Sequence, residues 1–407
     1  MNARIPTPGQ GVMEGFPPPG ERRITAANWQ EPEFLRWSLM HRCEQVGTVP
    51  IWRGDGPVSP LPDSPEPLDE LLVPGLDGTP VPLGRMLAAL ETDAFLVLHR
   101  GKVVYERYLH GMRASTQHSA ASISKSFLSV LAGILQDQGA LDFAREAQHY
   151  VPEMRGSAMG DATLQQLLDM QAGIERPVIE GRGSVVGQQD GGVYEILGLL
   201  DRQPGTPADF YEFVLKKPRA GRHGARFYYD NGPIEAMAWV IRRATGQRIA
   251  DLYSELLFAP MGAQRDAYIS VDRTGAEFAA GGLALVLRDM GRFGELLRHD
   301  GHWNGRQIVP QAFLADTRRG GDRALFAASP RSKVMPGGSY RNCFFHMHDD
   351  MEGFCASGRY GQRIYVSPRA ELVVAQFSSA GGAPPPHPFD APTARLQHAL
   401  ATHFVHR

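Results

Sequence analysis

The 407-residue sequence predicts an α/β fold, with strands and helices in one body and a mainly helical lobe inserted into it. Segments rich in β-formers occur early, after residue 93, and again late, after residue 362. Between them the apolar residues recur mostly at helical spacing. We therefore divide the chain into an extended arm, a body in two parts and a helical lobe: 1–85, 86–139 with 261–407, and 140–260.

The first 85 residues are rich in proline and glycine and show little periodicity. The prolines between Pro57 and Pro67 rule out a long helix in that stretch. We expect an extended arm that lies over the core, and a partly disordered tail is the alternative.

The first ordered part of the body follows. The segments AFLVLHR and KVVYERYLHG, on either side of Gly101, predict two strands around a tight turn. From Ser122 onward apolar residues such as Ile123 and Phe127 recur at helical spacing, and Gly139 is expected to end that helix. Ser122 therefore lies at a helix start, with Lys125 one turn further on.

The lobe is expected to contain several helices, and the rest of the body more strands. Helical periodicity marks 162–173, 207–217 and 233–246, and the glycine-rich stretch from Gly181 to Gly192 is expected to be a loop. A further helix is predicted over 281–301, two adjacent strands over 363–368 and 371–379, and a closing helix over 393–404.

Composition excludes several classes of protein. Hydrophobic residues make up 43% and charged residues 21%, as in an ordinary globular protein, and the net charge of -2 lacks the basic excess of nucleic-acid binders. The N-terminus has no apolar run typical of a signal peptide, and no stretch approaches the roughly 20 apolar residues of a membrane span. Three cysteines, a sparse and odd set, suit a reducing compartment. We expect a cytoplasmic protein that binds neither nucleic acid nor membrane.

The main chemical signal is Ser122-Ile123-Ser124-Lys125. Positions i and i+3 share a helix face, so the hydroxyl and the amine can meet. A serine needs an adjacent base to become a good nucleophile, and a neutral lysine can serve. The alternative interpretation is that Ser122 caps the helix and Lys125 is a solvated surface residue.

A tyrosine motif supplies the context. Tyr229-Asp230-Asn231 directly precedes the helix that Pro233 can open, so its side chains face a cleft. Tyr229 can pass a proton between the serine and the leaving group, and Asn231 can orient the lysine or the substrate. A second Y-x-N, Tyr340-Arg341-Asn342, leads into a strand, and we prefer the first.

The third segment, Ala356-Ser357-Gly358-Arg359, precedes the strand GQRIYVSP. In a serine hydrolase of this layout an edge strand supplies the second oxyanion N–H, and small residues let the substrate approach its backbone.

These three segments, in this order, resemble those of class C β-lactamases, family VIII esterases and D-stereospecific peptidases. The closer resemblance is to the nylon-oligomer amidases, the 6-aminohexanoate-dimer hydrolases. It is carried by DAFLVLHRGKVVYERY, SISKSF, YVPE, LQQLLDMQ, FYYDN with AMAWVI, and GRYGQ, and it runs from about Trp29 to the C-terminus. The resemblance implies a β-lactamase/transpeptidase-like fold, an antiparallel sheet flanked by helices.

The same resemblance implies the site. It makes Ser122 the nucleophile, Lys125 the base and Tyr229 the proton shuttle. The N–H groups of Ser122 and Arg359 would form the oxyanion hole.

The sequence departs from those relatives at four positions. Ala356 stands where β-lactamases have the lysine of K-T-G, so β-lactamase activity is not expected. Glu180 aligns with a tyrosine that grips the amide in nylon-oligomer amidases, and Arg359 and Tyr360 also differ and would alter the pocket. The nylon oligomer is therefore not expected to be the natural substrate.

Two other features have weaker interpretations. His346 and His348 share a strand face and could suggest a metal site, but no third ligand is evident, and a polar strand end is the preferred interpretation. Cys355 is interpreted as a buried structural thiol. We expect no metal and no organic cofactor.

The sequence thus predicts a serine hydrolase that cleaves esters or amides of small molecules through an acyl-enzyme. An acyltransferase or a D-amino-acid peptidase on the same fold is one alternative, and a non-catalytic binding protein is another. A homodimer is compatible with the sequence.

Overall fold

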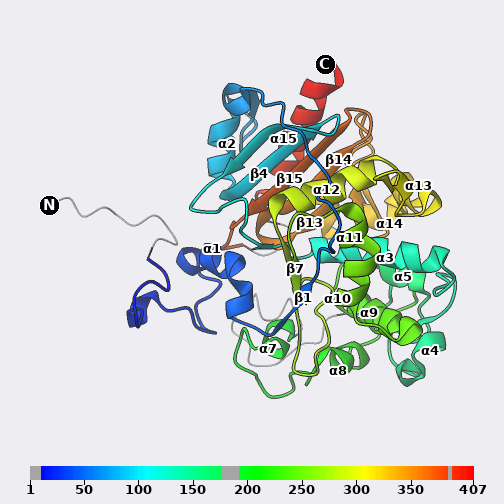
Figure 1. Ribbon diagram of the computed structural model, residues 1–407. Coiled ribbons are helices and arrows are strands. Elements are labelled where there is room, and N and C mark those ends of the chain that lie inside the picture. Colours follow the sequence, from blue (N-terminus) through cyan, green and yellow to red (C-terminus); the bar gives the residue numbers. More distant parts are fainter. Residues whose placement is uncertain (1–10, 176–191, 384–386) are drawn as a thin grey trace.

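The computed structural model describes residues 11–175, 192–383 and 387–407, and its core is a seven-stranded antiparallel sheet (Figure 1). The expected fold class, an antiparallel sheet flanked by helices, is confirmed. The strand order is β11-β12-β13-β14-β15-β4-β5. Their bounds are Ser339–Arg341, Phe344–His346, Phe354–Gly358, Gln362–Ser367, Leu372–Ser378, Thr92–His99 and Lys102–Tyr108.

Two of these strands form the predicted hairpin around Gly101. His99 pairs with Lys102, so Arg100 and Gly101 alone make the turn, with φ of 50° and 75°. Two-residue hairpin turns favour positive φ at both positions, because this matches the strand twist. The two predicted late strands, β14 and β15, also pair as neighbours.

A smaller sheet connects the N-terminal segment to the body. Its order is β1-β7-β8-β6, with bounds Thr48–Ile51, Ala267–Ser270, Leu283–Leu285 and His118–Ser119. Two short pairs complete the strands, β2 (Leu72–Pro74) with β3 (Pro80–Pro82) and β9 (His302–Trp303) with β10 (Arg306–Gln307). Residues 11–85 thus contain strands, helix α1 (Pro32–Met40) and the start of helix α2 (Leu83–Ala89). The division into arm, body and lobe stays a prediction.

Helices cover the large sheet and make up the regular structure described between residues 140 and 260. α12 packs on β15, β14 and β4, whereas α15 contacts β15 and α2 contacts β4 (Figure 1). The helices after α2 are α3 (Ile123–Asp137), α4 (Ala147–Tyr150), α5 (Leu164–Leu168), α7 (Val193–Ile196), α8 (Phe210–Leu215), α9 (Gly232–Thr245), α10 (Ile249–Tyr253), α11 (Ala259–Met261), α12 (Leu287–Arg298), α13 (Gln311–Arg319), α14 (Arg323–Ala327) and α15 (Asp390–Val405). In the described ranges, no helix is both long enough and apolar enough to span a bilayer.

Three predicted helices are shorter than expected, and the one predicted over 207–217 is limited to Phe210–Leu215. The helix predicted over 281–301 begins only at Leu287, because Leu283–Leu285 form β8 between β7 and β6. An apolar run of this length fits a buried strand as well as a helix. The helix predicted over 162–173 is limited to Leu164–Leu168, and Met170 has left the helical region with φ 55°.

Helix α3 forms the centre of the molecule. All its residues from Ile123 to Leu135 are buried, so packing holds it on every side. Phe127 stacks on Phe293 with ring centroids 3.7 Å apart. A Cβ at Gly133 would lie 2.5 Å from the Phe313 ring, so only glycine fits there. The first turn of α3 is therefore a rigid platform.

Candidate active site

Ser122 occupies the N-cap position of α3, and its side chain makes no capping hydrogen bond. The alternative interpretation of Ser122 as a helix cap is therefore wrong. The residue before it, Ala121, has φ 47°, a left-handed conformation that costs energy for a residue with a Cβ. This turn presents the Ser122 hydroxyl to a cavity of about 270 Å³.

Lys125 is fully buried, so it is not a surface residue. Its Nζ lies 3.0 Å from Ser122 Oγ, 2.8 Å from Asn231 Oδ1 and 2.7 Å from the carbonyl oxygen of Ala280. A carbonyl and an amide oxygen only accept hydrogen bonds, whereas a hydroxyl can also donate. A charged ammonium group would donate to all three oxygens, whereas a neutral amine would donate to Asn231 and Ala280 and accept from the Ser122 hydroxyl. The arrangement therefore fits a lysine that takes the serine proton.

Tyr229 lines the same cavity, directly before α9. The centroid of its ring is 5.2 Å from Lys125 Nζ, and the Arg331 guanidinium carbon lies 5.0 Å from it. Tyr340, from the second Y-x-N motif, packs edge-on behind Tyr229 at 5.9 Å. The structure thus brings the first motif, rather than the second, to Ser122 and Lys125.

A buried ion pair holds the turn that carries Tyr229. Asp230 lies 2.6 Å from Lys217 Nζ, and both side chains are almost completely buried. The same carboxylate accepts a hydrogen bond from the Gly232 N–H at the start of α9. Lys217 also lies over the Phe213 ring of α8, so the pair couples α8 to the turn.

The segment predicted to supply an oxyanion donor is the end of β13, which lies between β12 and β14 and is not the expected edge strand, and it passes directly beside the nucleophile turn. A Cβ at Gly358 would lie 2.6 Å from the carbonyl oxygen of Ala120, so glycine allows this close approach. Ser357, Arg359 and Tyr360 line the cavity. Arg359 donates from Nη1 to the Tyr194 hydroxyl at 3.1 Å, and Tyr360 has φ 65°. Glu180, the other expected binding residue, lies outside the described residues.

Glu235 is a functional candidate that the sequence did not reveal. It is buried on α9, and its Oε1 accepts the Ala280 N–H at 2.8 Å, on the peptide group next to the carbonyl that binds Lys125. Burial raises the pKa of Glu235 to about 8, although the Ala280 N–H and the charges of Arg242 and Lys125 lower it. The carboxyl therefore helps to fix the loop under Lys125.

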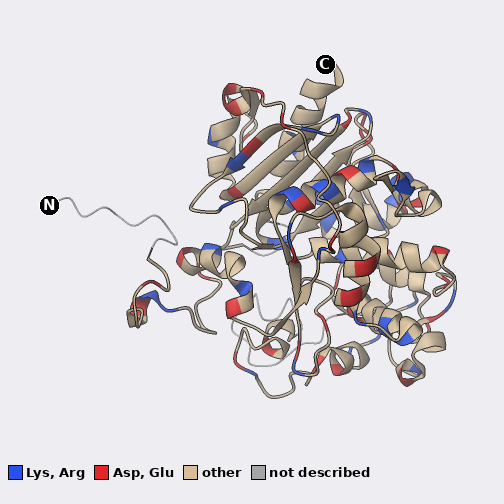
Figure 2. Cartoon of the chain, in the orientation of Figure 1, with Lys and Arg blue, Asp and Glu red and all other residues tan. Residues whose placement is uncertain are grey.

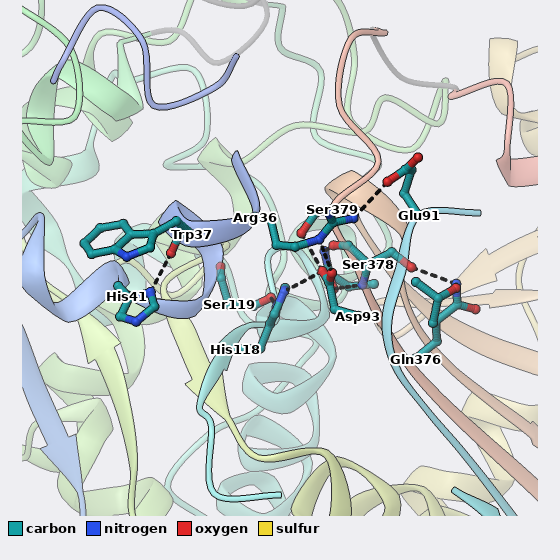
Figure 3. A network of polar contacts seen from close by, with 12 residues as sticks. Arg36, Trp37, His41, Glu91, Asp93, His118, Ser119, Gln376, Ser378 and Ser379 are labelled. Carbon is teal, nitrogen blue, oxygen red and sulfur yellow. Dashed lines mark hydrogen bonds and ion pairs between the residues drawn. The ribbon is translucent and has the colours of Figure 1, made fainter. Parts of the chain in front are cut away.

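A buried polar network positions the strand that leads into Ser122 (Figure 3). Asp93 accepts a hydrogen bond from Arg36 Nε at 2.6 Å and one from Ser379, and it lies 3.2 Å from His118 Nε2. His118 Nδ1 faces the carbonyl oxygen of Ser119 at 2.9 Å. Because both ring nitrogens face acceptors, only a doubly protonated ring donates to both. The network joins α1, β4, β6 and the residue that directly follows β15 (Leu372–Ser378).

His346, His348 and Cys355, the weaker candidates from the sequence, have structural roles. Burial lowers the pKa of His346 to about 3, and His348 contacts the Ser339 hydroxyl at 2.7 Å. Burial raises the pKa of the Cys355 thiol to about 12, which suits a structural residue rather than a nucleophile. Within the described part of the chain, no group of three or more His, Cys, Asp or Glu side chains could hold a metal ion.

Comparison with known proteins agrees with this geometry. A family model described as Beta-lactamase matches residues 85–399. A 6-aminohexanoate-dimer hydrolase from Paenarthrobacter ureafaciens is 32% identical over 383 residues, which cover 93% of each chain. A solved structure of a Bacillus anthracis protein assigned to the same kind of hydrolase is 31% identical, with a TM-score of 0.87 and coverage of 93% of this chain and 97% of that one. A Bacteroides dorei protein assigned as a beta-lactamase, 17% identical, shares the fold at a TM-score of 0.61, with 80% of this chain and 97% of that one covered.

Proposed function

Because the chain belongs to the beta-lactamase family of serine hydrolases, we propose that it cleaves carboxylic esters or amides of small molecules through an acyl-enzyme on Ser122. The observation that carries the proposal is the contact between Lys125 Nζ and Ser122 Oγ at 3.0 Å inside a cavity. A nucleophile and its base within hydrogen-bonding distance are what acyl transfer requires.

Acylation begins when Ser122 Oγ attacks the carbonyl carbon and Lys125 Nζ takes the hydroxyl proton. The carbonyl oxygen becomes an oxyanion, which the N–H groups of Ser122 and Arg359 are proposed to bind. The bond to the leaving group then breaks, and Tyr229 delivers the proton from Lys125 to the leaving oxygen or nitrogen. The products of this half-reaction are the acyl-serine ester and the free alcohol or amine.

Deacylation repeats these steps with water as the nucleophile. Water gives one proton to the Lys125–Tyr229 pair, its oxygen bonds to the acyl carbon, and Ser122 leaves with a proton from the same pair. The carboxylic acid is released and the enzyme returns to its starting state. No metal or organic cofactor enters the proposed cycle.

The test is a substrate panel with three variants. We expect the wild type to hydrolyse short 4-nitrophenyl esters, and Ser122→Ala to lose activity by about 10³-fold or more while keeping its melting temperature. The same panel includes linear amides, among them the 6-aminohexanoate dimer that appears in the names of the relatives. Lys125→Met and Tyr229→Phe test the base and the shuttle. A Ser122→Ala enzyme that keeps its activity would refute the proposal.

A further inference from the structure

One wall of the cavity contains a buried arginine, Arg42, which lies two residues after the end of α1. Arg42 is only 6% exposed and lines the same cavity as Ser122. Its guanidinium carbon lies 4.3 Å from the centroid of the Trp29 ring, and Nη1 donates to Gln45 Oε1 at 3.1 Å. Trp29 and Gln45 thus fix the position of the cation at the cavity wall.

Arg42 differs from the other buried arginines that the structure describes. Arg36 lies 2.6 Å from Asp93, Arg292 lies 2.8 Å from Asp289, and Arg363 pairs with Asp390. In the described ranges, no carboxylate forms an ion pair with Arg42. A buried charge without a counter-charge is strongly destabilising, because desolvation is not repaid.

The groups around Arg42 do not supply the missing charge. Burial lowers the pKa of its guanidinium, and the ionisable groups that oppose this shift are the phenols of Tyr360, Tyr194 and Tyr268, which are neutral near pH 7. Tyr194 packs edge-on against Trp29 at 5.1 Å and also lines the cavity, as does Tyr360. Aromatic walls exclude water, so an anion placed here would interact strongly with the guanidinium.

We propose that Arg42 is an anion-binding residue of the active site, and that it pairs with a carboxylate which the substrate carries in addition to the bond that is cleaved. The planar guanidinium fits a carboxylate through paired N–H groups. A cavity of about 270 Å³ limits the substrate to a small molecule. The inference rests on the proposed function, and it names the substrate class as monoesters or monoamides that bear a free carboxylate.

Two matched pairs of probes test this inference. In the first, mono-4-nitrophenyl adipate is compared with its neutral methyl ester, so the charge lies on the acyl side. In the second, 4-acetoxybenzoate is compared with methyl 4-acetoxybenzoate, so the charge lies on the leaving group. We expect kcat/KM to favour the carboxylate in one pair by about 10-fold or more, a ratio typical of a charged hydrogen bond.

The variants then assign that preference to Arg42. Arg42→Gln should lower the ratio of kcat/KM for the anionic over the neutral probe by about 10- to 100-fold, and Arg42→Lys should lower it less. Arg53→Gln is the control, because Arg53 bonds backbone carbonyls of Gly56 and Ala263 and does not line the cavity. It removes the same charge and should leave the ratio unchanged.

Two results would overturn the inference. One is that the wild-type enzyme shows no preference for the carboxylate in either pair of probes. The other is that Arg42→Gln and the wild type have the same ratio of kcat/KM for the anionic over the neutral probe. If Arg42→Gln does not fold, as judged by near-UV circular dichroism, the inference is tested by the preference of the wild type together with the ratio measured for Arg42→Lys. A wild type that hydrolyses none of the four probes, anionic or neutral, would instead refute the proposed function.

Discussion

At the residue scale, the chemistry depends on how the protons of Lys125 are distributed among its three neighbours. Asn231 and Ala280 offer oxygen atoms that only accept, and Ser122 offers a hydroxyl that can do both. A lysine that has lost one proton satisfies all three contacts, provided that the serine donates. A charged ammonium group would also satisfy all three contacts, by donating to each, so it is the proposed role of Lys125 as the base that requires the neutral amine.

Replacing Lys125 by arginine should consequently be almost as damaging as replacing it by methionine. Arginine stays protonated and cannot take the serine proton, and its planar head does not fit the compact space of an ammonium group. We expect both variants to lose about 10³-fold or more in kcat for a 4-nitrophenyl ester. A Lys125→Arg enzyme with most of its activity would show that the base lies elsewhere.

Glu235 makes a prediction about stability and pH. Its pKa is raised to about 8 in the folded state, against an ordinary value of 4.5, so the folded protein holds a proton that the unfolded chain releases. The free energy of unfolding should therefore decrease as the pH rises from about 4.5 to 8. The glutamine of Glu235→Gln cannot ionise. Over this pH window the free energy of unfolding of the variant should therefore decrease by about 2–5 kcal/mol less than that of the wild type.

Urea unfolding of the wild type and Glu235→Gln at pH 5 and pH 8 measures this difference. Glutamine keeps an oxygen that can accept the Ala280 N–H, so the loop should stay in place. Two stability curves that run parallel between pH 5 and pH 8 would show that the carboxyl titrates normally.

At the element scale, the site forms where two elements approach the first turn of α3. The turn before α9 brings Tyr229 and Asn231, and β13 passes against Ala120 at Gly358. The helix turn itself is local in sequence, so the spacing of Ser122 and Lys125 predicted it. The approach of the other two elements depends on tertiary packing.

Within β13, the buried and uncharged Ala356 stands where β-lactamases are expected to use a cation, and Arg359, which lines the cavity three residues further on, is the residue that could partly substitute for it. We therefore expect nitrocefin to be hydrolysed with a kcat/KM at least about 100-fold below that of the best ester, because the loss of one strong hydrogen bond to a charged group has an effect of this size. Comparable rates for nitrocefin and the ester would refute this expectation.

The ion pair between Lys217 and Asp230 should determine how firmly the turn before α9 is held. Lys217→Met would leave the Asp230 carboxylate buried without its lysine, at a cost of about 3–5 kcal/mol in the free energy of unfolding. The double variant Lys217→Met with Asp230→Asn removes both charges and should recover part of this loss. Chemical denaturation of the four proteins gives the coupling energy, and purely additive effects would contradict the account.

At the scale of the whole molecule, the buried network around Asp93 connects distant parts of the chain. Lysine, arginine, aspartate and glutamate are interspersed over the fold (Figure 2). The Asp93 network connects α1 to strands β4 and β6 and to Ser379, the residue after β15 (Figure 3). The N-terminal segment is thereby fixed next to the strand that leads into Ser122, and it places Arg42 in the cavity wall.

The sequence predicted the parts of this molecule that are local. The hairpin at Gly101, helices α3 and α9, and the pair Ser122 and Lys125 each follow from spacing within one segment. It did not predict Ala280, which lies 155 residues from the lysine it binds, nor Glu235 beneath it. The error at Leu283–Leu285 has the same origin, because only pairing with β7 and β6 makes that apolar segment a strand.

The central claim is that Ser122 forms a covalent acyl-enzyme, and mass spectrometry after labelling tests it most directly. The protein is incubated with a fluorophosphonate, its intact mass is measured, and the modified peptide is sequenced. We expect one adduct per chain on Ser122, none on Ser122→Ala, and slower labelling of Lys125→Met. An adduct on any other residue, or equal labelling of Ser122→Ala, would contradict the account.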